Sequence, residues 1–180
     1  MKRLKYLSIL LLFLIFTGSV KVHAQSTPEE LGERLFNLFK ERSANFIEVL
    51  PTKDQLQKKV QVMTAVPIQN RLEAFSKEYP ASVIRFNELC TGILEKGKET
   101  GINWKRIKLE SIKTYPQIIS IPYSDRVATV KFTKLSIYFT YRHRAFILIA
   151  DAVMDFDGHY LISDDLLEFS EIATNTWYQP

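Results

Sequence analysis

The sequence predicts an α+β fold in which N-terminal helices pack on one face of an antiparallel β-sheet. Two observations lead to this prediction. Apolar residues recur at helical spacing from position 26 to Gly101, whereas from Trp104 onward they approach the alternation that is typical of strands. Helices followed by consecutive antiparallel strands are typical of folds that place the helices on one side of a sheet.

The N-terminal segment has the three parts of a secretory signal peptide. A basic start, MKRLKY, precedes the apolar run LSILLLFLIF, and small residues follow at Val22 and Ala24. An uncleaved membrane anchor is the alternative, and the apolar run is short for a membrane span. We predict a signal peptide over residues 1–24, cleaved near Ala24, and a single domain over 25–180. We expect a secreted or periplasmic protein with no membrane span after cleavage.

Cleavage would remove the positive charge of the precursor. The whole chain has 24 Lys and Arg against 20 Asp and Glu, but four of these basic residues and no acidic residue precede Gln25. The mature chain would therefore be neutral. Nucleic-acid binding rests mainly on a basic balance, so we expect no nucleic-acid partner.

The first helix is predicted from Ser26 or Thr27, either of which can accept a hydrogen bond from an amide of the first turn. Pro28 suits the first helical turn, where its missing amide donor is not needed. Apolar residues recur every three or four positions as far as Pro51, which ends the segment. Thr52 is then suited to cap a short second helix.

The next helical segment runs from position 67 to Gly101 and contains Pro80. Pro80 either separates two helices or kinks a single one, because proline lacks an amide hydrogen and crowds the preceding turn. Gly101 is suited to end the segment. Cys90 is the only cysteine, so no internal disulfide can form, and its apolar neighbours predict a buried thiol. The apolar stripe consists of Val83, Ile84, Phe86, Leu89, Cys90, Ile93 and Leu94.

Alternating apolar and polar residues predict the strands of the sheet. The predicted strands cover 105–115, 126–141, 144–156 and 159–163. Chain reversal at Arg142–His143 would place apolar residues opposite one another on one face, which we expect to be the core. The expected pairs on that face are Phe139 with Phe146, Ile137 with Leu148, and Leu135 with Ala150.

The segment DFDGHYLISDD, at positions 155–165, holds four acidic residues and a histidine. A calcium loop with Gly158 in sixth place would begin at Val153, which cannot ligate, and would lack the final glutamate. No His/Cys cluster has zinc spacing either, so we expect no metal and no cofactor. Asp157–Gly158 predicts a tight hairpin turn instead. That turn would pair Phe156 with His159, Asp155 with Tyr160, Met154 with Leu161, and Val153 with Ile162.

The same register would bring Lys134, Asp151 and Asp164 into one row across the sheet. Two ionised carboxylates opposite each other repel, and a lysine on the other side of Asp151 would let both stay charged. The apolar residues also switch from even to odd positions near Thr133–Lys134. This switch predicts a β-bulge, and bulges often lie beside functional sites. The row is consistent with a solvated charge ladder or with a site. The candidate catalytic residues are Asp151, Asp164, Lys134 and Tyr160.

The order of segments resembles exported bacterial proteins of the NTF2-like (cystatin-like) superfamily. The resemblance rests on a leader, on a helix ending in FIEVLPTKDQLQ, on GINWKRIK, and on IYFTYRHRAFILIADAVMDFDGHYLISD. It implies helices packed on a curved antiparallel sheet to form a cone, often with a pocket between them. Enzymes of that superfamily place acids, tyrosines or histidines inside the cone, and many members are not catalytic.

Three functions remain open on the sequence. The first is an exported, non-catalytic domain that binds a small ligand or a protein partner. The second is an NTF2-like enzyme, an isomerase, dehydratase or hydrolase, that uses Asp151 with Lys134 or Tyr160. The third is a structural module that forms a homodimer through the sheet. Fold alone does not decide among them.

Overall fold

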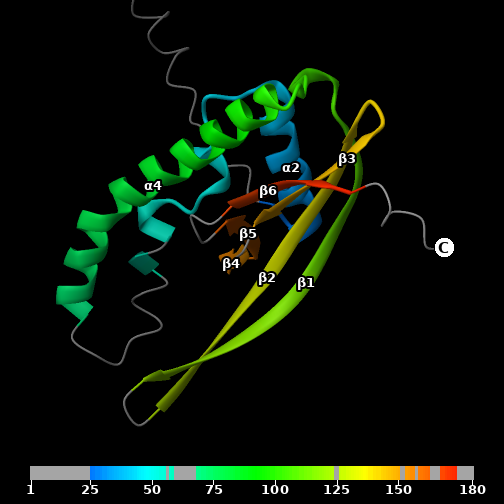
Figure 1. Cartoon of the computed structure of the whole chain (residues 1–180). Coiled ribbons are helices and arrows are strands. Elements are labelled where there is room, and N and C mark those ends of the chain that lie inside the picture. The colour runs from blue at the N-terminus through cyan, green and yellow to red at the C-terminus, as the bar shows by residue number, and fades with distance from the viewer. Residues whose placement is uncertain are drawn as a thin grey trace, which may run out of the picture.

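The chain folds into helices packed on a curved, four-stranded antiparallel sheet, which confirms the predicted α+β class (Figure 1). The computed structural model describes residues 25–55, 57–58, 68–123, 126–150, 153–156, 158–162 and 167–173. The predicted signal peptide, residues 1–24, lies outside the described residues. Helical elements with described bounds include α2 (Pro28–Glu41), the 3₁₀ turn η1 (Ile47–Val49), α4 (Ile68–Glu99) and the 3₁₀ turn η2 (Trp104–Arg106), and residues 53–55 and 57–58 are helical as well.

The strands form one larger and one smaller sheet. The four-stranded sheet has the order β1-β2-β3-β6, and β4 pairs with β5 in a separate two-stranded sheet. Figure 1 shows that β1 and β2 bend along their length and extend beyond the other strands as a two-stranded ribbon. The strands are β1 (Lys108–Tyr123), β2 (Arg126–Tyr141), β3 (Arg144–Ala150), β4 (Val153–Phe156), β5 (His159–Ile162) and β6 (Leu167–Ile172).

Helix α2 begins as the sequence predicts and ends earlier than predicted. Thr27 is the N-cap, and its Oγ1 accepts a hydrogen bond from the Glu30 amide at 3.1 Å. The helix ends at Glu41 because Arg42 adopts a left-handed conformation, with φ of 55°. The Ser43 amide then bonds back to the Leu38 carbonyl at 2.9 Å, a pattern that closes helix C-termini. Pro51 therefore does not end this helix.

Helix α4 is one continuous helix that contains Pro80, so of the two alternatives the single helix is correct. Gly101 ends it as predicted, with φ of 83°, and the Ile102 amide bonds to the Gly97 carbonyl at 2.8 Å. Most of the predicted apolar stripe packs toward the core. Ile84 does not, since it is 58% exposed.

The β2–β3 pairing has the predicted register, and the residues on the predicted core face of these strands are buried. The predicted bulge near Thr133–Lys134 is wrong. Both residues pair without interruption with β1, and the irregularity lies in β1 between Leu109 and Ser111. The change of apolar phase in β2 instead coincides with the point where β2 loses its pairing with β3, before Leu135.

The β4–β5 hairpin has the predicted pairs, and Gly158 has the positive φ, 81°, that the turn requires. The prediction that β5 continues the main sheet is wrong. Strand β3 ends at Ala150, and β6, which the sequence did not predict, pairs with β3. Ile162 is buried in the core, and Tyr160 packs against it.

The core is held together by aromatic rings around Trp104. The indole ring centroid lies 5.5 Å from Phe39 of α2, 5.9 Å from Phe139 of β2 and 5.8 Å from Phe169 of β6. Its Nε1 donates a hydrogen bond to the Leu94 carbonyl of α4 at 2.9 Å. Trp104 thus joins α2 and α4 to strands β2 and β6 of the sheet.

The contact between Trp104 and α4 predicts opposite effects of alanine at two glycines of one helix. A Cβ at Gly97 would lie 2.3 Å from Trp104 Cζ2, whereas a Cβ at Gly92 would meet nothing within 4 Å. Alanine favours a helix over glycine by about 1 kcal/mol, and forcing extra atoms into a packed core costs about 1–3 kcal/mol. We expect Gly97→Ala to lower the free energy of unfolding and Gly92→Ala to raise it, as measured by urea denaturation. Equal effects of the two substitutions would contradict the packing of Trp104.

Candidate functional site

Of the four predicted site residues, the structure describes Lys134 and Tyr160. Asp151 and Asp164 lie outside the described residues. Lys134 lies half-buried on β2, opposite Tyr115 of β1. Tyr160 lies on β5, in the separate hairpin sheet, where its amide donates to the Gln25 carbonyl at 2.8 Å. The two described candidates therefore belong to different sheets.

Cys90 is buried, as predicted. Burial raises the pKa of its thiol to about 12. The nucleophilic form of cysteine is the thiolate, so this side chain is inert near neutral pH.

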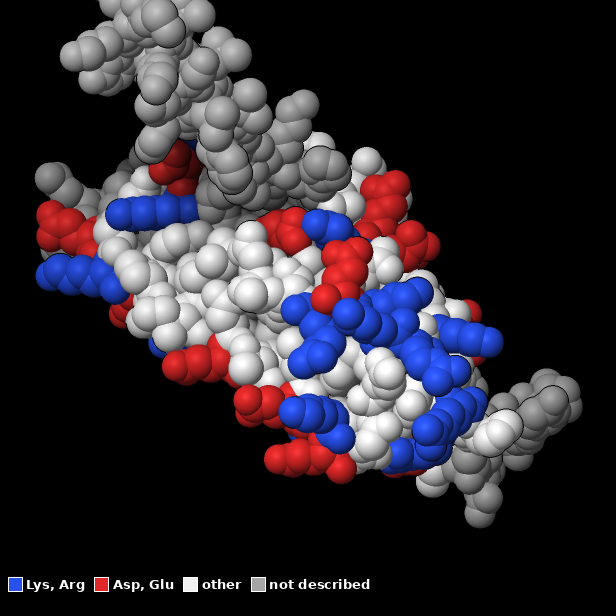
Figure 2. Space-filling view, turned by 90° about the horizontal axis from the view of Figure 1, so that it is seen from above, with Lys and Arg blue, Asp and Glu red and all other residues white. Residues whose placement is uncertain are grey.

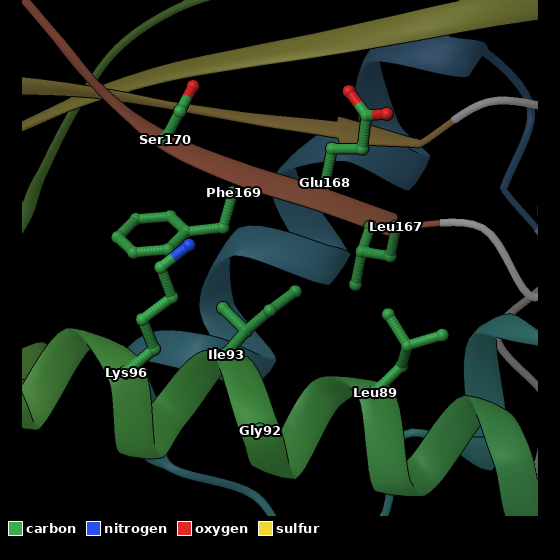
Figure 3. Close-up of a pocket in the computed structure, with 8 residues that line it drawn as sticks. All are labelled: Leu89, Gly92, Ile93, Lys96, Leu167, Glu168, Phe169 and Ser170. Atoms are coloured by element: carbon green, nitrogen blue, oxygen red, sulfur yellow. The ribbon is translucent and has the colours of Figure 1, made fainter.

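An open groove lies between α4 and β6 (Figure 3). Its volume is about 550 Å³, within the range of small-molecule sites. Ile93 and Leu167 are buried at its base, while Leu89 and Phe169 are partly buried. The lining residues are Leu89, Gly92, Ile93, Lys96, Leu167, Glu168, Phe169 and Ser170.

The helical wall of the groove is one stripe of α4. Leu89, Gly92, Ile93 and Lys96 follow one another at spacings of three, one and three residues, which places them on one side of a helix. Figure 3 shows Leu89 and Ile93 pointing from α4 toward β6. Gly92 contributes no side chain, and a Cβ there would meet nothing within 4 Å. The groove therefore has room beside the middle of this stripe.

The side chains of β6, which form the other wall, point alternately to the two faces of the sheet. Leu167 and Phe169 point toward α4, whereas Glu168 and Ser170 point away from it (Figure 3). The Phe169 ring stacks on Phe146 at 5.8 Å, with 17° between the ring planes. The Lys96 ammonium lies 6.0 Å from the centroid of the same ring, at the limit of a cation–π contact. The groove is thus apolar inside and carries a cation at its rim.

One edge of β6 has no neighbouring strand in the part of the chain that the structure describes, where β6 pairs with β3 alone. The two-residue turn at Arg142–His143 makes Tyr141 and Arg144 a hydrogen-bonded pair, and this sets the alternation across β3. The backbone N–H and C=O groups of β6 that face away from β3 are consequently those of Leu167, Phe169 and Glu171.

The opposite edge of the sheet, formed by β1, is less able to pair with a further strand. By the same alternation, the even-numbered residues of β1 from Ile112 onward, beyond the irregularity, direct their backbone groups away from β2. Pro116 and Pro122 are both among them, and proline has no amide hydrogen to offer. Prolines at such positions discourage pairing with further strands. Strand β6 has no proline, so its edge is the more open of the two.

An ion pair fixes one end of β6. The Arg144 guanidinium donates to both carboxylate oxygens of Glu171, at 2.7 and 2.5 Å. Another guanidinium nitrogen donates to the Thr100 carbonyl, just beyond α4, at 2.6 Å. The hydrogen bonds from Arg144 hold the pKa of Glu171 below its ordinary value. One arginine therefore connects β3 and β6 to the end of α4.

Comparisons with models of protein families, with curated proteins and with solved structures gave no match. Among the described residues, no helix is long and apolar enough to cross a membrane. The same part of the chain contains no group of three or more His, Cys, Asp and Glu side chains that could hold a metal ion.

The sequence indicated the helical wall of this groove but not its strand wall. The apolar stripe of α4 was predicted, but its Leu89–Ile93 face was assigned to the core as a whole. The alternation of Leu167, Glu168, Phe169 and Ser170 is a strand pattern that the acidic segment before it obscured.

Removing the Phe169 ring should destabilise the fold, since the ring joins β6 to the aromatic core. Large-to-small substitutions of a fully buried phenylalanine cost about 3–5 kcal/mol, and this ring is only partly buried. We expect Phe169→Ala to lower the free energy of unfolding by about 2–3 kcal/mol and Phe169→Leu by less than about 1.5 kcal/mol. Denaturation of both variants in urea measures this, and a loss below 1 kcal/mol for alanine would contradict the stacking described.

The Arg144–Glu171 pair should give a small acid dependence of stability. A carboxyl with a lowered folded pKa stabilises the fold fully above its ordinary pKa, near 4.5, and this contribution disappears as the pH falls through the folded value. Both side chains are more than a third exposed, so solvent screening keeps the effect small. We expect Arg144→Met to raise the pKa of Glu171, as followed by the NMR shift of its carboxyl carbon. An unchanged titration would contradict the pairing.

Proposed function

We propose that this protein is a non-catalytic binding domain that takes an extended segment of a partner protein into the groove between β6 and α4. The observation that supports this most is the free edge of β6 beside an apolar helical wall. Addition of a strand to an exposed sheet edge is a common mode of peptide recognition. The partner segment would lie along β6 as a fifth strand of the main sheet.

Backbone hydrogen bonds would supply much of the affinity. Leu167, Phe169 and Glu171 each offer one N–H and one C=O group toward the groove, so about five or six residues of the partner could pair. Such groups do not depend on the identity of the partner's side chains. The walls of the groove would therefore provide selectivity.

The lining residues favour a segment of particular composition. Alternate side chains of an added strand would point toward α4, where Leu89, Ile93 and Phe169 form an apolar surface. Lys96 at the rim favours a carboxylate on the partner. The proposed partner segment is thus apolar at alternate positions, with one acidic residue near Lys96.

The groove supports binding rather than catalysis. Its polar side chains are those of Lys96, Glu168 and Ser170, and the latter two point away from α4. A general base or nucleophile needs an oriented partner within hydrogen-bonding distance, and none of the hydrogen bonds described joins these three. We also propose that the protein acts after export and belongs to the NTF2-like superfamily. The helices on a curved sheet support the second of these proposals.

Selection of peptides from a random seven-residue library on the chain from Gln25 to Pro180 tests the binding mode. Only every second amide of an added strand faces β6, so N-methylation of a selected peptide at alternate positions should weaken binding at least about tenfold in one register and little in the other. Fluorescence anisotropy of the labelled peptide measures this. Equal loss in both registers would argue for a different bound conformation.

A substitution that fills the groove, compared with the same substitution beside it, tests the binding site on the protein itself. Gly92→Trp places a large side chain at a residue that lines the groove, and its Cβ would meet nothing within 4 Å. Thr91→Trp adds the same side chain at the neighbouring exposed position, which does not line the groove. We expect the first variant to abolish peptide binding and the second to retain it. Retention by both would place the bound peptide elsewhere.

A further inference from the structure

Cations gather at the end of the molecule where α4, η2 and the β2–β3 turn meet. Figure 2 shows Lys and Arg side chains concentrated over one part of this face. Exposed cations at this end come from the last turn of α4, from η2, from the start of β1 and from the turn. We call these five residues the basic end: Lys98, Lys105, Arg106, Lys108 and Arg142.

The fold holds these elements together. The Arg144 guanidinium donates to the Thr100 carbonyl at 2.6 Å, which ties the β2–β3 turn to the end of α4. Lys108 pairs with Thr140, two residues before Arg142. The buried Trp104 begins η2, and the two cations that follow it in this turn are exposed. These contacts hold together the elements that carry the five cations.

Little of this charge is neutralised locally. Glu171 is paired with Arg144, and Glu110 accepts a hydrogen bond from Thr140 Oγ1 at 2.7 Å. Among the described residues, no salt bridge involves the basic end, and the nearest exposed acid in sequence is Glu99. The Arg142 guanidinium lies 5.3 Å from the Tyr141 ring centroid, which leaves its donors available. Of the five cations only Lys98 lies in the last turn of an α-helix, so the dipole of α4 accounts for Lys98 alone.

We propose that the basic end docks the protein on a membrane surface rich in anionic phospholipid. The five cations come from four elements and are exposed, so they match an extended layer of phosphate groups better than a single small anion. Lys and Arg side chains near an anionic leaflet are attracted individually, and their contributions add. Residues 25–180 have as many acidic as basic residues, so the charge asymmetry would orient the molecule as well as attract it.

Co-sedimentation with lipid vesicles tests the proposal on the chain from Gln25 to Pro180. We expect binding to phosphatidylcholine vesicles that contain about 30 mol% phosphatidylglycerol, and none to phosphatidylcholine alone. Binding should disappear at about 0.5 M NaCl, where the Debye length is short. The double substitution K105E/R106E should weaken binding at least about tenfold, because it reverses two of the five charges.

The matched control reverses two exposed lysines elsewhere, in the variant K53E/K77E. It has the same net charge as K105E/R106E and should bind nearly as the parent does, and thermal melts of both variants confirm that they fold. Equal weakening by both pairs would show that net charge alone matters and would overturn the proposal. Equal binding to neutral vesicles would do the same. Binding of a short DNA duplex without binding to vesicles would assign the basic end to nucleic acid instead.

Discussion

The packing of the Trp104 indole against α4 is the contact on which the other features depend. A glycine at position 97 lets the ring approach the helix backbone, and the Leu94 carbonyl accepts its N–H. The same ring contacts aromatic side chains of α2, β2 and β6. Through these contacts Trp104 connects α4 to β6, and the two cations that follow it in η2 are exposed.

The two edges of the main sheet differ in a way that bears on function. Strand β1 carries prolines at positions whose amides would face outward, which limits further pairing. Strand β6 lacks them and has α4 alongside, so its edge lies in an apolar groove instead of open solvent. An edge of this kind can select a partner segment, whereas an uncovered edge would invite unspecific association.

Local signals in the sequence predicted most of the helices and strands and the pairing registers of two hairpins, β2–β3 and β4–β5. The Thr27 cap, the Gly101 stop and the Gly158 turn were recognisable because each depends on the conformation of a few neighbouring residues. The pairing of β2 with β3 followed from a two-residue turn and an apolar alternation. The errors had two sources. Helix α2 ends because Arg42 adopts the left-handed conformation that glycine usually signals. The place of the β4–β5 hairpin depends on contacts that no local pattern encodes.

By itself, the sequence determined the α+β class, the hairpin registers and the burial of Cys90, because periodicity and turn chemistry act over short distances. Only the tertiary structure decided which strand stands beside β3, which sheet edge is open and where the cations meet. These properties arise from residues far apart in the chain, such as Arg144 with Thr100 and Lys96 with Phe169. Packing brings such residues together, and no spacing in the sequence specifies it.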